Sequence, residues 1–267
     1  YYIAVHLKYN IMKNIKLLNG DEFKVSDIIP KMYDDVFYYG YLGQHALSSS
    51  SCKKLIESPK AYATSLTEGS PDSQALRDGR LTHLCVLEPH RLDEFTFVDG
   101  TKASKSFKLA AEELGKDLVY TNLELNKAQK IAKAVLANEE AAALLSGCEF
   151  EIPAIGEFMG LPFRGKADAK KGTTIIDLKT TANIQDFEYS AKKYSYDLQA
   201  ALYLDLFDAD DFIFLVVDKR TLDVGVYTIT AGFVDSGLQK LQVATDAYKN
   251  YIMSDYDLEQ YTFYGEL

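Results

Sequence analysis

Hydrophobic and polar residues alternate along two neighbouring segments, residues 163–168 (FRGKAD) and 173–180 (TTIIDLKT). Alternation with a period of two is typical of β-strands, because successive side chains of a strand point to opposite faces of the sheet. Two lysines and a glycine at residues 170–172 separate the two segments. We therefore expect a β-hairpin with its turn at these residues.

Three further segments are predicted to be strands. Residues 149–158 (EFEIPAIGEF) lead into the hairpin. Residues 212–217 (FIFLVV) form a continuous apolar run, of the kind found in strands that are buried on both faces. Residues 224–230 alternate again, and residues 221–223 form the turn between these last two strands.

Helical spacing of apolar residues predicts the other elements. A serine near the start of residues 47–62 suits an N-cap, and we expect Pro59 to end this helix. The stretch from Thr121 to Glu124 has the T-x-x-E pattern of a capping box and opens another helix. Residues 186–205 are predicted to form one amphipathic helix or two short ones. The full set of predicted helices is residues 47–62, 78–89, 121–147, 186–205 and 233–253.

The length of 267 residues suits one large domain, or one domain with an appendage. The composition, 47% hydrophobic and 25% charged, is that of a soluble globular protein. No apolar run approaches the roughly 18 residues that span a membrane, and no secretory signal is evident. We expect residues 1–40 to be an N-terminal appendage on a main domain of residues 41–267. Residues 1–11 precede the first methionine and are expected to be an upstream or added extension.

Cysteines and charge narrow the range of functions. Cys52, Cys85 and Cys148 are widely spaced and odd in number, which argues for a reducing compartment and against a disulfide framework. Three cysteines are also too few for a four-cysteine zinc or iron–sulfur site. The formal net charge of −10 gives no support for DNA binding by the chain as a whole. Any DNA binding must therefore use a local basic surface and metal ions.

The predicted hairpin brings together residues that suit metal chemistry. Folding it places Asp168 beside Asp177, and Asp177 shares one face of its strand with Lys179. Ile176 and Leu178 point the other way, into a core. Two adjacent carboxylates suit a hard cation such as Mg²⁺. A neighbouring lysine can position or deprotonate a water molecule, or neutralise charge that develops on a phosphate.

An Asp followed by D-x-K across a hairpin resembles the active-site pattern of the PD-(D/E)XK nuclease superfamily. Other stretches resemble motifs of its RecE-like, or exonuclease VIII-type, members and occur in the same order along the chain. They are the serine-rich helix of residues 47–62, G-x-x-x-H-x-x-x-L-x-P with His83, and Y-x-x-Q-x-x-x-Y with Tyr196, Gln199 and Tyr203. The resemblance spans about residues 47–251.

The resemblance implies an α/β fold, in which helices flank a central mixed β-sheet. It also implies a metal site with ligands from Asp168, Asp177 and the backbone carbonyl of Leu178. His83 and Glu151 would complete or tune this site as further metal ligands.

The resemblance assigns the remaining catalytic roles as well. The family pattern places a glutamate at the start of the strand before the hairpin, which favours Glu151 over Glu157. Lys179 would orient the attacking water and stabilise developing negative charge, and Gln199 would bond near the carboxylates. The implied catalytic set is Asp168, Asp177, Lys179, Gln199, Glu151 and His83.

Several aromatic and basic residues are expected to contact DNA. Tyrosines of the helix after the hairpin would position the strand, and basic residues would meet phosphates. For each lysine taken singly, a solvated surface position is the alternative. The predicted DNA contacts are Tyr203, Tyr196, Arg164, Lys166, Lys192, Lys193 and Lys53.

The resemblance implies an exodeoxyribonuclease that depends on Mg²⁺, with Mn²⁺ as a substitute, and degrades linear double-stranded DNA from 5′ to 3′. Its partners would be DNA ends, other copies of the chain in a ring, and a single-strand annealing protein, with no membrane. Such a phage- or prophage-encoded protein would act in the bacterial cytoplasm. The alternatives are an endonuclease on the same core, and a non-catalytic DNA-binding or assembly module, which the net charge of −10 mildly favours.

Overall fold

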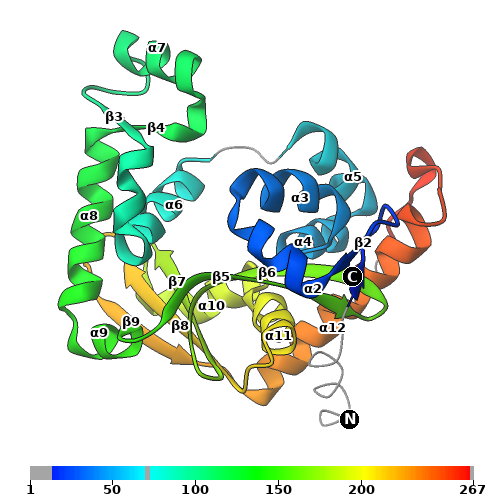
Figure 1. Ribbon diagram of the computed structural model, residues 1–267. Helices are drawn as coiled ribbons and strands as arrows, with labels where there is room; N and C mark the ends of the chain where they lie inside the picture. The colour runs from blue at the N-terminus through cyan, green and yellow to red at the C-terminus, as the bar shows by residue number, and fades with distance from the viewer. Residues whose placement is uncertain (1–13, 70–72, 265–267) are drawn as a thin grey trace.

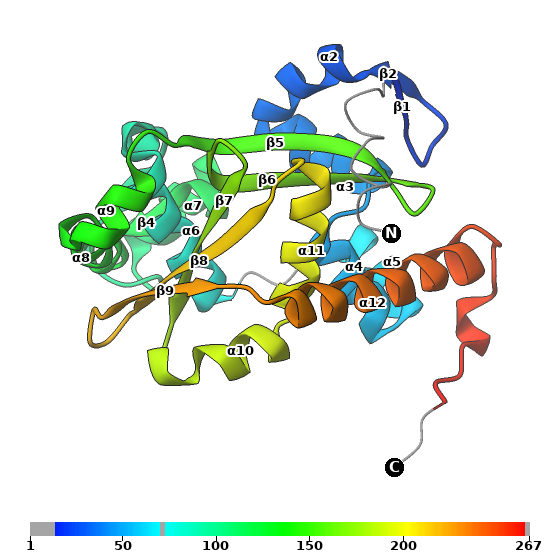
Figure 2. The same ribbon diagram turned by 90° about the horizontal axis from the view of Figure 1, so that it is seen from below.

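A five-stranded mixed sheet forms the centre of the molecule, with strand order β5-β6-β7-β8-β9 (Figure 2). The computed structural model describes residues 14–69 and 73–264, so the extension predicted at residues 1–11 lies outside the described residues. β7 and β8 run parallel, whereas the other neighbouring strands are antiparallel. The strands are β5 (Glu149–Phe158), β6 (Leu161–Lys171), β7 (Thr174–Thr181), β8 (Asp211–Asp218) and β9 (Val224–Thr228). The predicted mixed sheet is thus confirmed.

β6 and β7 form the predicted hairpin, but they pair only near its turn. The paired residues run from Lys171 and Thr174 to Ala169 and Ile176, and beyond them the strands diverge at Asp168. The turn comes later than predicted, at residues 172–173, because the preceding lysines still pair in the sheet. The parallel connection from β7 to β8 needs a crossover, and helices α10 and α11 provide it.

Five helices cover one face of the sheet. Aromatic and aliphatic residues of β6 to β8, among them Phe163, Ile175 and Phe214, form the core beneath them. The predicted helix at residues 47–62 is in fact two helices, because Ser58 caps a second one in which Pro59 occupies the first turn. The helices are α4 (Ser49–Glu57), α5 (Pro59–Glu68), α10 (Phe187–Lys193), α11 (Tyr196–Leu206) and α12 (Ala231–Ala247).

The opposite face of the sheet packs against helices α6 (Gln74–Leu87), α8 (Asn122–Ala137) and α9 (Glu139–Leu145), which form a separate column in Figure 1. Ile176 and Leu178 of β7 enter this second core, as the alternation predicts. The capping box of Thr121 and Glu124 is present at the start of α8. A small unit projects from this column and consists of η4 (Pro89–Glu94), β3 (Thr96–Val98), α7 (Lys105–Leu114), η5 (Lys116–Leu118) and β4 (Val119–Thr121).

The N-terminal elements pack against β5 through a third core. Ile15, Ile28 and Leu42 lie in this core with Ile155 of β5. The sequence predicted an N-terminal appendage of residues 1–40 packed on the main domain. This division stays a prediction, and the third core extends beyond residue 40 to Ala46. The elements are β1 (Asn14–Lys16), β2 (Glu22–Lys24), α2 (Val25–Ile28), η2 (Ile29–Tyr33), η3 (Val36–Tyr41) and α3 (Leu42–His45).

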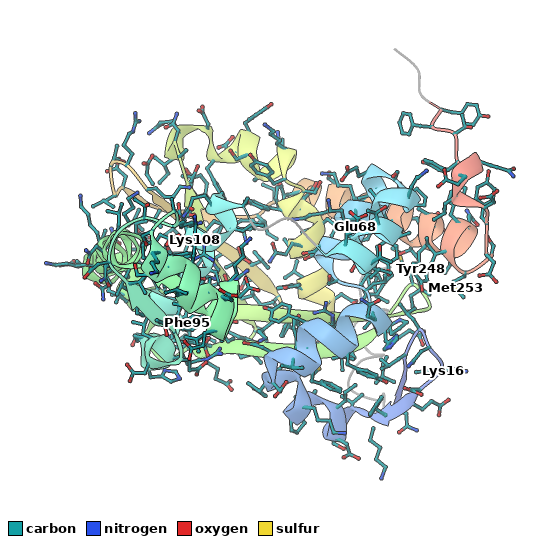
Figure 3. The ribbon with its side chains drawn as sticks, turned by 90° about the horizontal axis from the view of Figure 1, so that it is seen from above. Lys16, Glu68, Phe95, Lys108, Tyr248 and Met253 are labelled. Atoms are coloured by element: carbon teal, nitrogen blue, oxygen red, sulfur yellow. The ribbon has the colours of Figure 1, made fainter. Side chains whose placement is uncertain are left out.

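The last predicted helix is shorter than expected, because after α12 the chain widens into a π-helix, η7 (Tyr248–Ile252). Tyr248 and Met253 lie at the end of the molecule opposite Phe95 and Lys108 (Figure 3). Short 3₁₀ turns are η6 (Ile184–Asp186) and η8 (Leu258–Gln260). Among residues 14–69 and 73–264, no helix has the length and apolar character needed to cross a membrane.

Candidate active site

The candidate active site begins where β6 and β7 separate. Here the Leu178 backbone N–H donates a 2.8 Å hydrogen bond to Asp168 Oδ2, in place of a regular sheet pairing. The side chain of Asp168 therefore reaches across to β7, one residue from Asp177. The proximity of these two carboxylates was predicted from the hairpin.

Asp177 and Lys179 project from the same face of β7. Lys179 Nζ lies 2.5 Å from Asp177 Oδ2, and the side-chain amide of Gln199 donates a 2.7 Å hydrogen bond to Asp177 Oδ1. Only 1% of Asp177 is exposed. Both of its oxygens therefore have a partner on the protein, one from β7 itself and one from α11.

Glu151 completes the acidic part of the site from β5. Its neighbours Phe150 and Ile152 pair with Ala169 and Ala167, so Glu151 faces Asp168. Its φ angle of 51° is left-handed, a conformation that non-glycine residues adopt rarely and often at functional sites. Glu157, the other candidate, is exposed near the far end of β5, opposite Pro162.

His83 of α6 lies beside the same carboxylates. Its Nε2 is 2.7 Å from the carbonyl oxygen of Leu178, and its Nδ1 is 3.5 Å from Asp168 Oδ2. Burial alone would lower the pKa of His83, but the Asp168 carboxylate outweighs burial and raises the pKa to about 9. At neutral pH the ring is therefore an imidazolium whose Nε2 donates to the Leu178 carbonyl and whose Nδ1 is ion-paired with Asp168.

The other titrating groups respond to the same surroundings. Burial, followed by the Asp168 charge, raises the pKa of Glu151 to about 8. Burial also favours protonation of Asp168, but the neighbouring His83 and Lys179 lower its pKa overall. Burial disfavours the Lys179 ammonium, yet Asp177 and Asp168 raise its pKa, so Lys179 remains charged. A lysine in this state stabilises negative charge and does not act as a base.

One group of described residues can hold a metal ion. Ligand atoms of His83, Glu151 and Asp168 all lie within 4.8 Å of one another. At neutral pH His83 and Glu151 hold protons beside the Asp168 carboxylate, and the charge of a divalent cation bound among the three groups would displace those protons. Asp177 is not a member of this group, and its two oxygens contact Lys179 and Gln199.

Tyr203 was predicted to contact DNA, and the structure places its side chain inside the protein, between α11 and β6. It is only 7% exposed, and its hydroxyl donates to the backbone carbonyl of Lys166 at 3.2 Å. Gly165 allows this approach, because a Cβ there would lie 2.9 Å from Tyr203 Cε1. Tyr203 thus anchors α11, and with it Gln199, to β6.

Arg164 and Lys166 are held by the N-terminal elements. Arg164 is buried over the ring of Tyr38 and donates to the carbonyl of Leu42 at 3.2 Å. Lys166 Nζ lies 3.0 Å from a carboxylate oxygen of Asp35, and also over the ring of Tyr38. Neither cation lies free on the surface, and no local feature of the β6 sequence signals these distant partners.

The other predicted DNA contacts lie around α10, α11 and α4. Tyr196 is half-buried, and the ammonium groups of Lys179 and Lys53 lie 5.0 Å and 5.2 Å from the centroid of its ring. Lys192 and Lys193 are exposed at the end of α10. Of these residues, Tyr196 contacts Lys179 and Lys53, and Lys193 lies over the ring of Tyr194.

Comparison with known families agrees with this geometry. The family described as "PDDEXK-like domain of unknown function (DUF3799)" matches residues 48–257, which is most of the chain. The chain belongs to this PDDEXK-like family. The PD-(D/E)XK resemblance drawn from the sequence is therefore confirmed. PDDEXK nucleases in general depend on divalent metals, which agrees with the ligand group described above. No curated protein sequence matches the chain.

A solved structure shares the fold of this PDDEXK-like chain. A structure from Eubacterium rectale named "Putative exonuclease" is 16% identical, with a TM-score of 0.59 over 87% of this chain and 94% of the other. A phage-related exonuclease from Haemophilus somnus 129PT is 18% identical and covers 79% of this chain and 96% of the other, with a TM-score of 0.34. At 16% identity the likeness to the Eubacterium rectale structure shows the fold alone. The TM-score of 0.34 for the Haemophilus somnus structure is too low to support an argument.

Proposed function

We propose that this protein is a metal-dependent nuclease that hydrolyses phosphodiester bonds in DNA. The observation that supports it is the convergence of His83, Glu151 and Asp168 next to the paired Asp177 and Lys179. A bound cation, a buried ammonium and a fixed carboxylate together suit metal-assisted hydrolysis of a phosphodiester.

Each residue of the site has a separate role in this proposal. His83, Glu151 and Asp168 would hold the cation, which supplies charge neutralisation and a lower pKa for water. Lys179 keeps its ammonium beside the scissile phosphate and stabilises the negative charge that develops there. Gln199 holds Asp177 in place, so that Asp177 can position water or join the ligands when substrate releases Lys179.

We further propose an exodeoxyribonuclease on linear duplex DNA, with Mg²⁺ as the ion and 5′ to 3′ polarity. The RecE-like motif order and the exonuclease name of the Eubacterium rectale structure support this finer assignment. A homo-oligomeric ring and a single-strand annealing partner in a bacterial cytoplasm belong to the same proposal. The metal site alone does not favour exonuclease over endonuclease, so the test includes both.

The test is digestion of linear duplex DNA labelled at either end, with circular plasmid in parallel, with and without Mg²⁺. We expect Mg²⁺-dependent loss of linear DNA with circles intact, and a label pattern that gives the polarity. Asp168→Asn and Lys179→Ala should lower the rate at least about 100-fold, because each removes charge from the site. Asp211→Asn changes an exposed carboxylate at the far end of β8 and should leave the rate unchanged.

Each other outcome selects a different function. Cleavage of circles that also depends on Lys179 would identify an endonuclease. DNA binding without digestion of either substrate, in any divalent ion, would overturn the nuclease proposal in favour of a binding or assembly module.

A further inference from the structure

A row of aromatic rings and ammonium groups leads outward from the catalytic lysine. Lys179 Nζ lies 5.0 Å from the centroid of the Tyr196 ring, and the Tyr194 ring follows at 6.1 Å from that of Tyr196. Lys193 Nζ then lies 5.6 Å from the Tyr194 ring, and Lys53 Nζ flanks Tyr196 at 5.2 Å. The row thus consists of two neighbouring aromatic rings with an ammonium group at each end and a third beside Tyr196.

The inner part of the row is rigid. The Tyr196 ring packs against Phe187 and Phe214, with centroid separations of 6.1 Å and 5.8 Å. Ser195, between the two tyrosines, has a left-handed φ of 50°, which turns the chain sharply from α10 into α11. The position of Tyr194 relative to Tyr196 is therefore set by the backbone as well as by packing.

The outer part of the row is open to solvent. Tyr194 is 53% exposed, although an aromatic side chain gains most by burial. Lys192 and Lys193 beside it are exposed as well. Glu188, the acidic residue of α10, lies in its first turn, so the end of the helix next to Tyr194 is basic. Exposed aromatic rings interleaved with lysines are typical of surfaces that bind single-stranded nucleic acid, where bases stack and phosphates pair with ammonium groups.

We propose that Tyr196 and Tyr194, with Lys53 and Lys193, form a stacking track for the unpaired end of the strand that is cleaved. The proposal rests on the proposed nuclease function and extends it. Aromatic rings on a protein surface stack on bases that are unpaired, so a strand that uses this row is single-stranded where it lies on Tyr194. The track offers the unpaired bases a π surface that ends at Lys179.

Binding of a short single strand tests the track apart from catalysis. A fluorescein-labelled oligothymidylate is titrated onto the full chain in Ca²⁺, and the Kd is read by anisotropy. Tyr194→Leu should weaken binding about tenfold, which is within the range of one lost base-stacking contact, and Tyr194→Phe should stay within about twofold. Lys193→Ala should lower the slope of log Kd against log salt by roughly one phosphate contact.

Tyr189→Leu is the matched control. Tyr189 lies on the same helix α10 and is 68% exposed, and among the described residues no ring contact joins it to the row. Its Kd should equal that of the unaltered protein. The track proposal would be overturned if Tyr194→Leu had the Kd of the unaltered protein, or if Tyr189→Leu lost as much affinity as Tyr194→Leu.

The digestion and binding experiments distinguish failure of the nuclease proposal from failure of the track proposal. Digestion of linear DNA without Tyr194-dependent binding of the oligonucleotide would reject the track and leave the nuclease intact. Tyr194-dependent binding without digestion would reject the nuclease and leave a single-strand binding surface.

Discussion

The side-chain amide of Gln199 donates a 2.7 Å hydrogen bond to Asp177 Oδ1 and so links α11 to β7. The bond fixes a carboxylate that is only 1% exposed. Gln199→Ala should lower kcat about 10- to 100-fold, as the loss of a residue that orients a catalytic group does. Digestion of linear DNA under saturating substrate measures the effect.

Gln185→Ala is the control for Gln199, because Gln185 is an exposed glutamine on η6. It should digest DNA at the unaltered rate. A Gln199→Ala protein with unchanged kcat would show that Asp177 needs no orientation from α11.

His83 touches both the Leu178 carbonyl and the Asp168 carboxylate, at 2.7 Å and 3.5 Å. His83→Ala should weaken Mn²⁺ binding about 10- to 100-fold, measured by calorimetry, since it removes a ligand or the group that orients one. His90→Ala removes an exposed histidine of η4 and should bind Mn²⁺ normally. Equal affinity in both variants would remove His83 from the metal site.

The stability of the metal-free protein should fall as the pH rises from about 6.5 to about 9. In the folded chain His83 and Glu151 have pKa values of about 9 and about 8, above their ordinary 6.5 and 4.5. Folding therefore holds both protons more tightly, and this stabilisation disappears as the pH passes the folded values. Thermal melts in chelator across this window test the expectation.

Glu151→Gln should flatten that pH dependence, because an amide has no proton to lose. Glu157→Gln, an exposed change on the same strand, should keep the slope of the parent. An unchanged slope in Glu151→Gln would contradict the assignment. Divalent ions should raise the melting temperature more at pH 8.5 than at pH 6.5, since the pKa of Glu151 is about 8 and less free energy is then needed to remove its proton.

Gly165 sits where α11 packs most closely on β6. A Cβ at this position would meet Tyr203 Cε1 at 2.9 Å and Leu206 Cδ2 at 3.0 Å. Gly165→Ala should therefore lower the free energy of unfolding by about 1–3 kcal/mol through overpacking, measured by denaturant melts. Gly79→Ala, in α6 with no atom within 4 Å of the added Cβ, should be neutral or stabilising. Equal effects of the two changes would exclude overpacking as the cause.

Local periodicity predicted the elements and the pairing of functional groups within them. The period of two along β7 placed Asp177 and Lys179 on one face, with Ile176 and Leu178 in the core. Residues that are close in sequence are held by the geometry of one element, so the pattern alone determines which of them meet.

Tertiary structure decided what each group contacts across elements. Arg164 and Lys166 share a strand face with Asp168 in the sequence pattern, yet Tyr38 and Asp35 hold them, more than a hundred residues earlier in the chain. The anchoring of Tyr203 on β6 arises in the same way. Such contacts depend on how whole elements pack, and packing is a property of side-chain volumes and charges summed over distant segments, which no local spacing encodes.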